Sequence, residues 1–241
     1  MDWFAAVDIY CERTAPGFWN EPLNAISNLS FILAAIWAGN ESRKRPGQPL
    51  VIYMLIALCF LIGIGSFLFH TFANTWSELA DVIPIWAFVA IYILASVRLI
   101  GGVSPGRILR VSLMVIAGII ITFMATSGND TSQSNPETPI SILNGSGQYL
   151  PAVCAMLILS ALTWKRRHPL APWFITATIM FMISLTFRTL DMHLCAAWPF
   201  GTHQMWHLLN GLMLGVLLQA LIRNTARPDQ PIQLAPGAMS D

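Results

Sequence analysis

Charged side chains are scarce in this sequence, and their scarcity excludes a soluble fold. Asp, Glu, Lys and Arg make up 10% of its 241 residues, whereas a soluble domain carries about 25%. Hydrophobic residues make up 55%, and the mean hydropathy is +0.61. So few charges cannot cover a surface that faces water, and the composition therefore indicates an integral membrane protein.

The few basic residues exclude further classes. The net charge is +1 and no basic tract is present, so nothing in the sequence indicates a nucleic-acid partner. The N-terminus lacks the basic residues that open a cleaved signal peptide, so the first apolar run is expected to remain as a span. Lys44 and Lys165 are the only lysines, and both lie in predicted loops. A retinal Schiff base inside a span is therefore excluded.

Seven apolar runs are long enough to cross a bilayer, which takes about 20 residues each. They predict an all-α membrane protein, a bundle of seven transmembrane helices. Residues 1–22 are expected to form a non-cytoplasmic N-terminal segment, 23–223 the seven-span domain, and 224–241 a cytoplasmic, disordered tail. The seven runs cover residues 23–41, 50–72, 79–100, 108–126, 147–164, 171–190 and 203–223.

Loop charges predict the orientation of the bundle. Basic residues follow the first, third, fifth and seventh runs, and acidic residues dominate the segments between, so the N-terminus is expected outside and the C-terminus in the cytoplasm. A compact chain with short loops and no carboxy-terminal sorting signal favours a bacterial inner membrane. The basic residues on the side predicted to be cytoplasmic are Arg43, Lys44, Arg45, Arg98, Arg107, Arg110, Lys165, Arg166, Arg167, Arg223 and Arg227.

Three of the five histidines form a pattern. His70 lies near the end of the second run, and His203 and His207 begin the seventh, so the predicted topology brings all three to the non-cytoplasmic side. Imidazole is costly in hydrocarbon, and three neutral imidazoles with one open position make a catalytic zinc site. Histidines four apart share a helix face, which suits one ion and does not suit two separate haems. His168 and His193 lie in connections and are not expected to bind the ion.

Ser66 and Asp81 are the candidate catalytic residues beside this site. Ser66 precedes His70 by one helical turn, and Asp81 opens the third run. A carboxylate beside zinc can accept a proton from an activated water. Two structural interpretations compete: the Ser66 hydroxyl could bond back to its own helix, and Asp81 could be a helix N-terminal charge.

The cysteines divide by their place relative to the membrane. Cys59 and Cys154 fall within apolar runs and are expected to be buried and inert. Cys11 and Cys195 lie in non-cytoplasmic segments, where disulfides persist. We predict that these two are bonded.

Taken together, the motifs resemble those of the alkaline ceramidases, whose wider superfamily of seven-span hydrolases includes the progestin and adiponectin receptors. The resemblance implies a bacterial-type, zinc-dependent amide hydrolase that cleaves ceramide or a related N-acyl lipid to a fatty acid and a sphingoid-type amine. It implies zinc at His70, His203 and His207, catalysis by Ser66 and Asp81, and the disulfide. The motifs are Tyr10-Cys11-Glu12, Glu21 to Asn28, Gly63 to Thr71, Glu78 to Pro84, Asp191 to Cys195 and His203 to His207.

The same resemblance implies a calcium site in the N-terminal segment. Glu12 and Glu21 match two acidic ligands of the family, and Asp8 could substitute for a third by a shift of one residue. Ile9 and Thr14 stand where the family has an aspartate and an asparagine. Because calcium takes six to eight oxygen ligands, a solvated acidic loop is the competing interpretation.

Two other functions fit parts of the pattern. An intramembrane serine protease of rhomboid type would use Ser66 with a histidine, and a receptor of the adiponectin-receptor kind would bind a ligand without turnover. Four side chains near the histidines are candidates to line an acyl channel, although plain packing explains such aromatics equally well. They are Phe67, Phe69, Met205 and Trp206. Arg188 is expected to pair with Asp191 as a structural contact.

Overall fold

The computed structural model describes residues 2–99, 103–127 and 143–224. Its elements are helices, as predicted, and the described residues contain one isolated β-bridge, between Ala6 and Asn74. The bounds are α1 Pro22–Ser27, α2 Leu29–Lys44, α3 Leu50–Phe72, α4 Thr75–Leu99, α5 Pro105–Ser127, the 3-10 helix η1 Ser146–Tyr149, α6 Leu150–Lys165, α7 Ala171–Leu194 and α8 His203–Asn224.

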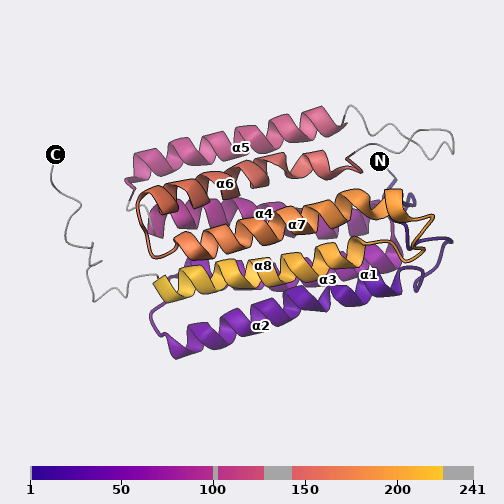
Figure 1. Ribbon diagram of the computed structural model, residues 1–241, viewed down its shortest axis with the longest axis horizontal. Coiled ribbons are helices and arrows are strands. Elements are labelled where there is room, and N and C mark those ends of the chain that lie inside the picture. Colours follow the sequence, from indigo (N-terminus) through magenta and orange to yellow (C-terminus); the bar gives the residue numbers. More distant parts are fainter. Residues whose placement is uncertain (1, 100–102, 128–142, 225–241) are drawn as a thin grey trace.

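The long helices lie side by side in one elongated bundle (Figure 1). Helix α8 packs against α2 and α7, α3 packs against α2 and α4, and α6 packs against α7. Helix α8 is the most enclosed of the apolar segments. The N-terminal segment, the end of α3 and the start of α8 meet at the same end of the bundle (Figure 1).

Six segments of the described chain are long and apolar enough to cross a membrane, which makes this an integral, multi-pass membrane protein. Helix α5 occupies the position of the predicted fourth span, yet it is not among the six, so a seventh span and the orientation of the termini stay predictions. The predicted tail lies outside the described residues from 225 onward. The six are Pro22–Lys44, Leu50–Phe72, Thr75–Arg98, Ser146–Lys165, Ala171–Leu194 and His203–Asn224.

The first span is not one continuous helix, because α1 ends and α2 begins on either side of Asn28. Polar side chains are buried at this junction: the Asn28 amide and the Ser27 hydroxyl each donate to the Asn24 carbonyl, both at 2.8 Å. The break turns Ser27 toward the start of α8, where its hydroxyl meets His207.

Helices α3 and α4 touch backbone to backbone at Gly65. A Cβ added at Gly65 would overlap the carbonyl group of Ala80 and would lie 3.1 Å from the backbone nitrogen of Asp81. Only glycine permits so close an approach. The contact brings the start of α4, and with it Asp81, against the last turns of α3.

Candidate metal centre

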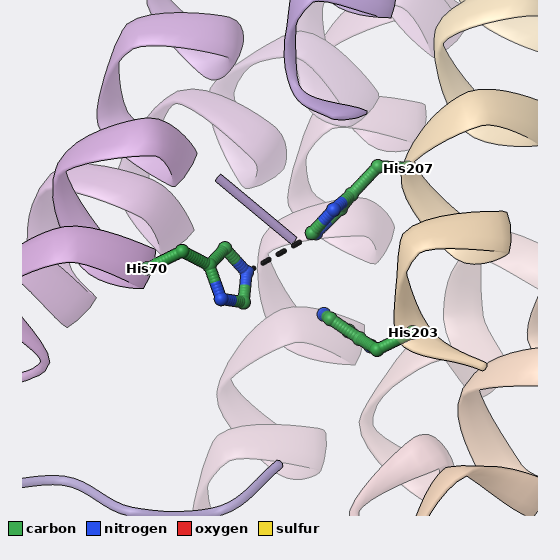
Figure 2. Close-up of side chains that lie close together, drawn as sticks. All are labelled: His70, His203 and His207. Carbon is green, nitrogen blue, oxygen red and sulfur yellow. Dashed lines mark hydrogen bonds between the residues drawn. The ribbon is translucent and has the colours of Figure 1, made fainter. Parts of the chain in front are cut away.

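Three buried imidazoles come together at the end of α3 and the start of α8. His70, His203 and His207 are each 2% exposed or less, and their candidate ligand atoms all lie within 4.8 Å of one another. Figure 2 shows the three rings pointing toward a common space, with 3.2 Å between the Nε2 atoms of His70 and His207. Two nitrogens bound to one tetrahedral zinc lie roughly 3.3 Å apart, so these residues fit a zinc ion. Neither His168, which precedes α7, nor His193 in its last turn joins them.

Each imidazole is held from behind by another side chain. His70 Nδ1 lies 2.5 Å from Glu21 Oε2, and His207 Nδ1 lies 2.8 Å from the Ser27 hydroxyl. Partners on Nδ1 direct the opposite nitrogen of each ring toward the common space, as in most histidine metal sites. The His203 ring stacks on Tyr10 at 3.7 Å between centroids.

His203 also carries an unpaired nitrogen. Its buried Nδ1 has no hydrogen-bond partner among the described residues. Buried polar atoms almost always have a partner, so this ring needs one from outside the chain, either an ion or an ordered water. The unpaired atom belongs to one of the three clustered rings.

Asp191 holds the start of α8 in place. Its Oδ1 accepts hydrogen bonds from the backbone N–H groups of Thr202 and His203, at 2.7 and 2.9 Å, and its Oδ2 accepts one from Cys11 at 3.0 Å. The predicted disulfide joins Cys11 to Cys195, with 5.4 Å between the Cα atoms. The N-terminal segment is thereby fastened to the turn that carries His203.

Arg188 does not pair with Asp191, contrary to the prediction. Because Asp191 is already taken by backbone N–H groups, no ion pair links the two within the described chain. Arg188 instead donates to the Asn144 carbonyl, and its guanidinium lies over the rings of Tyr149 and Trp206 at 5.3 and 5.9 Å. A buried cation therefore lies beside the metal centre on the side of η1.

Ser66 and Asp81 lie next to the histidines, as their spacing predicts. Ser66 is buried, and its hydroxyl interacts with the Asp81 carboxylate. The Asp81 Oδ1 atom is buried and has no partner among the described residues. Asp81 also interacts electrostatically with His70. The carboxylate thus has one oxygen available to accept a proton near the imidazoles.

The acidic residues of the predicted calcium site are not gathered around a common space. Asp8 is exposed, and both oxygens of Glu12 accept backbone N–H groups at the start of α1, from Leu23 and Asn24, at 2.8 Å each. Burial raises the pKa of the Glu12 carboxyl. In the described part of the chain the three histidines are the only cluster of potential metal-ligand side chains. These acidic residues therefore do not fit a calcium ion.

Glu21 serves the histidine cluster instead. Its Oε1 accepts from Arg13 at 2.5 Å, and its Oε2 lies within hydrogen-bond distance of both His70 and Asn24. Burial raises the pKa of this carboxyl, but the hydrogen-bond donors around it, His70 foremost and then Asn24 and Arg13, outweigh burial and hold the pKa below its ordinary value. Glu21 is thus an ionised carboxylate attached directly to a candidate zinc ligand.

An apolar cavity inside the bundle reaches α8 beside the histidine cluster. Trp206, on the α8 turn between the two histidines, lines its end nearest the site, and Tyr149, Asn210, Met213 and Leu217 line its length. Of the four predicted channel residues, Trp206 is the one in this lining; Phe69 packs on Tyr10 instead.

The two cysteines outside the disulfide are free thiols. Cys59 is buried, as predicted, whereas Cys154 is exposed, contrary to the prediction.

Sequence reasoning missed four residues of the site: Tyr10, Arg13, Ser27 and, in its actual role, Asp191. The contact between Ser27 and His207 joins residues 180 positions apart, and that between Asp191 and Cys11 does the same. No periodicity or spacing reports such contacts. Three of the four lie within the motifs quoted above and Arg13 directly follows one of them, so the motifs pointed to these segments without disclosing the roles of the residues.

Comparison with known proteins gives a consistent result. The ceramidase family matches residues 10–233 of this chain. Alkaline ceramidase YPC1 of Saccharomyces cerevisiae is 25% identical over 253 aligned positions, which cover 84% of this chain and 77% of the yeast protein. The matched range 10–233 spans the histidine cluster, Ser66, Asp81 and both bonded cysteines. This chain therefore belongs to the ceramidase family.

Proposed function

We propose that this protein is a zinc-dependent amide hydrolase that cleaves the N-acyl bond of ceramide or a related membrane lipid, releasing a fatty acid and a sphingoid-type amine. The observation that carries the proposal is the buried cluster of His70, His203 and His207, with the Ser66–Asp81 pair beside it. Membership of the ceramidase family supports the same activity, and the yeast relative is an alkaline ceramidase.

The three histidines would hold the ion, and the side chains around them would direct the reaction. Bound zinc would supply a Lewis acid and lower the pKa of a water to about 7. Asp81 accepts the proton of the attacking water at its unpaired oxygen and later delivers it to the leaving amine nitrogen. Ser66 donates its hydroxyl hydrogen to the amide oxygen as negative charge develops there.

The apolar cavity would hold the acyl chain. Its lining on α8 runs from Trp206 to Leu217, which is roughly 16 Å at about 1.5 Å per residue. That length is about half of the 30 Å hydrocarbon core, so a chain lying in it stays surrounded by apolar side chains. The amide carbonyl at the end of the acyl chain would then face the histidines. We propose that this chemistry takes place in the non-cytoplasmic half of a bacterial inner membrane, in agreement with the loop charges.

The rival functions have less support from the site. A serine protease needs a base hydrogen-bonded to Ser66, and the Ser66 partner is Asp81. The ring nitrogens of His70 and His207 contact Glu21, Ser27 and each other instead. A receptor without turnover would not need a carboxylate with an unpaired buried oxygen beside the histidines.

The test uses the purified full-length protein in lipid nanodiscs with a panel of N-acyl lipids, mass spectrometry of the products, and metal analysis. We expect His207→Ala to lose both zinc and hydrolysis, and Asp81→Asn to lose hydrolysis while keeping zinc. His168→Ala, at the opposite end of the bundle, is the matched control. Full zinc and full activity in His207→Ala would sink the assignment. Loss of activity in Ser66→Ala with resistance to chelators would identify a serine hydrolase instead.

A further inference from the structure

The segment before α1 holds a buried cation of its own. Arg13 is 9% exposed, and its guanidinium contacts three separate parts of the chain. Its Nε donates to the Glu21 carboxylate, one terminal nitrogen donates to the Gly17 carbonyl at 3.3 Å, and the other donates to the His70 carbonyl at 3.1 Å. One positive group therefore cross-links the start of α1, the preceding loop and the end of α3.

The acceptors around this guanidinium are those that a calcium ion would use. Calcium binds carboxylate and backbone carbonyl oxygens, and Arg13 is bound by one carboxylate and two carbonyls. The neighbouring Glu12 carboxylate is taken by backbone N–H groups. A second cation here would have to desolvate beside a buried guanidinium, which like-charge repulsion opposes.

This cation is connected to the histidine cluster through one carboxylate. Arg13 binds Oε1 of Glu21, and Oε2 of the same carboxylate binds Nδ1 of His70. Outer hydrogen-bond partners of this kind orient a metal-binding imidazole, and their loss typically costs about 10–100-fold in metal affinity. Arg13 also holds the backbone of His70 directly through the carbonyl oxygen.

We propose that Arg13 is an internal replacement for a calcium ion: its guanidinium positions Glu21 and His70, and the metal centre is therefore assembled without calcium. The proposal rests on the proposed function in one respect, that His70 is a zinc ligand. Arg13 is a positioning residue, since it acts on the metal through Glu21 and the His70 backbone. The sequence differences agree, because Ile9 provides no carboxylate and Thr14 no side-chain amide oxygen where the resemblance implies an aspartate and an asparagine.

The test measures zinc affinity, by competition with a fluorescent zinc chelator, and melting temperature. The full-length protein is stripped of metal, and each measurement is made with zinc added back, without calcium and with about 1 mM calcium, the range of weak extracellular calcium sites. We expect the unaltered protein to show the same zinc affinity and melting temperature in both conditions. A calcium-dependent rise in either quantity in the unaltered protein would overturn the proposal.

Three variants extend the test. Arg13→Ala should bind zinc about 10–100-fold more weakly. Arg13→Lys keeps the positive charge but not the forked N–H donors of the guanidinium, so its zinc affinity should lie between those of the unaltered protein and Arg13→Ala. Calcium should restore zinc affinity to Arg13→Ala or to Ile9→Asp/Arg13→Ala, whereas magnesium should not. The matched control Arg43→Ala removes an exposed arginine whose partner is Asn40 and should change nothing.

Unchanged zinc affinity in Arg13→Ala, or failure of calcium to act on both alanine variants, would refute the replacement. If Arg13→Ala does not fold, Arg13→Lys and the calcium titration of the unaltered protein decide the question. Neither readout uses a lipid substrate. A protein that behaves as expected here but hydrolyses no N-acyl lipid would therefore contradict the proposed function alone.

Discussion

Replacing Gly65 by alanine adds one methyl group where α3 and α4 touch backbone to backbone. The new Cβ would meet the carbonyl of Ala80, and because that group belongs to the backbone of α4, relief requires the helix itself to move. The shift needed is on the order of 1 Å, and overpacking of this kind typically costs about 1–3 kcal/mol of stability. The movement carries Asp81 away from Ser66.

Activity should fall much more than zinc binding. A misplacement of about 1 Å in catalytic groups can cost roughly 100-fold in rate, so Gly65→Ala should hydrolyse N-acyl lipid about 100-fold more slowly. Zinc content should stay near that of the unaltered protein, because α4 carries none of the three histidines. The assays are lipid product analysis, zinc quantification and thermal unfolding in nanodiscs.

Gly39→Ala is the matched control. Gly39 also lies inside an apolar helix, α2, but a Cβ there would meet nothing within 4 Å. Alanine should therefore raise stability by about 0.5–1 kcal/mol, through the loss of glycine flexibility alone, and leave the rate unchanged. Equal losses of rate in the two variants, or full activity in Gly65→Ala, would refute the role assigned to the α3–α4 contact.

Three further predictions concern the supports of the site. Ser27→Ala removes the partner of His207 Nδ1 and should weaken zinc binding about 10–100-fold; an unchanged competition titration would count against that support. Cys11→Ser opens the disulfide and should lower stability by roughly 2–5 kcal/mol, so a melting temperature insensitive to the substitution and to reductant would contradict it. Asp191→Asn replaces the charged acceptor of the Thr202 and His203 N–H groups by a neutral one and should lower the free energy of unfolding by about 1–3 kcal/mol. The measurements are melting temperature and zinc affinity, and both should fall. A melting curve that matches that of the unaltered protein would argue that α8 needs no such anchor.

The helices could be predicted closely because long apolar runs determine which segments enter a membrane. The run 50–72 coincides with α3, and that at 203–223 ends within one residue of α8. The break at Asn28 could not be predicted, because hydropathy is averaged over a window of residues and does not detect a local turn in the backbone. Polar atoms buried at that turn, such as the Ser27 hydroxyl, form bonds that depend on a distant helix.

The candidate site was predictable only where its residues share a helix. His203 and His207 share one face through their spacing of four, and the same spacing links Ser66 to His70. The roles of Glu21 and Arg13 were not predictable, because their contacts depend on how the N-terminal segment folds over the end of α3. The resemblance pointed to the right segment but did not disclose that Arg13 and His70 are the partners of Glu21.

The disulfide and the Asp191 anchor also impose an order on biosynthesis. Cys11 is synthesised early, whereas its disulfide partner Cys195 follows 184 residues later. The hydrogen bond from the Cys11 backbone N–H to the Asp191 carboxylate likewise forms only after Asp191 has been synthesised. Two of the three histidines come later still. The N-terminal segment can therefore close over the histidines only after nearly the whole chain has been made. A truncated product that ends before α8 therefore lacks two of the three clustered histidines.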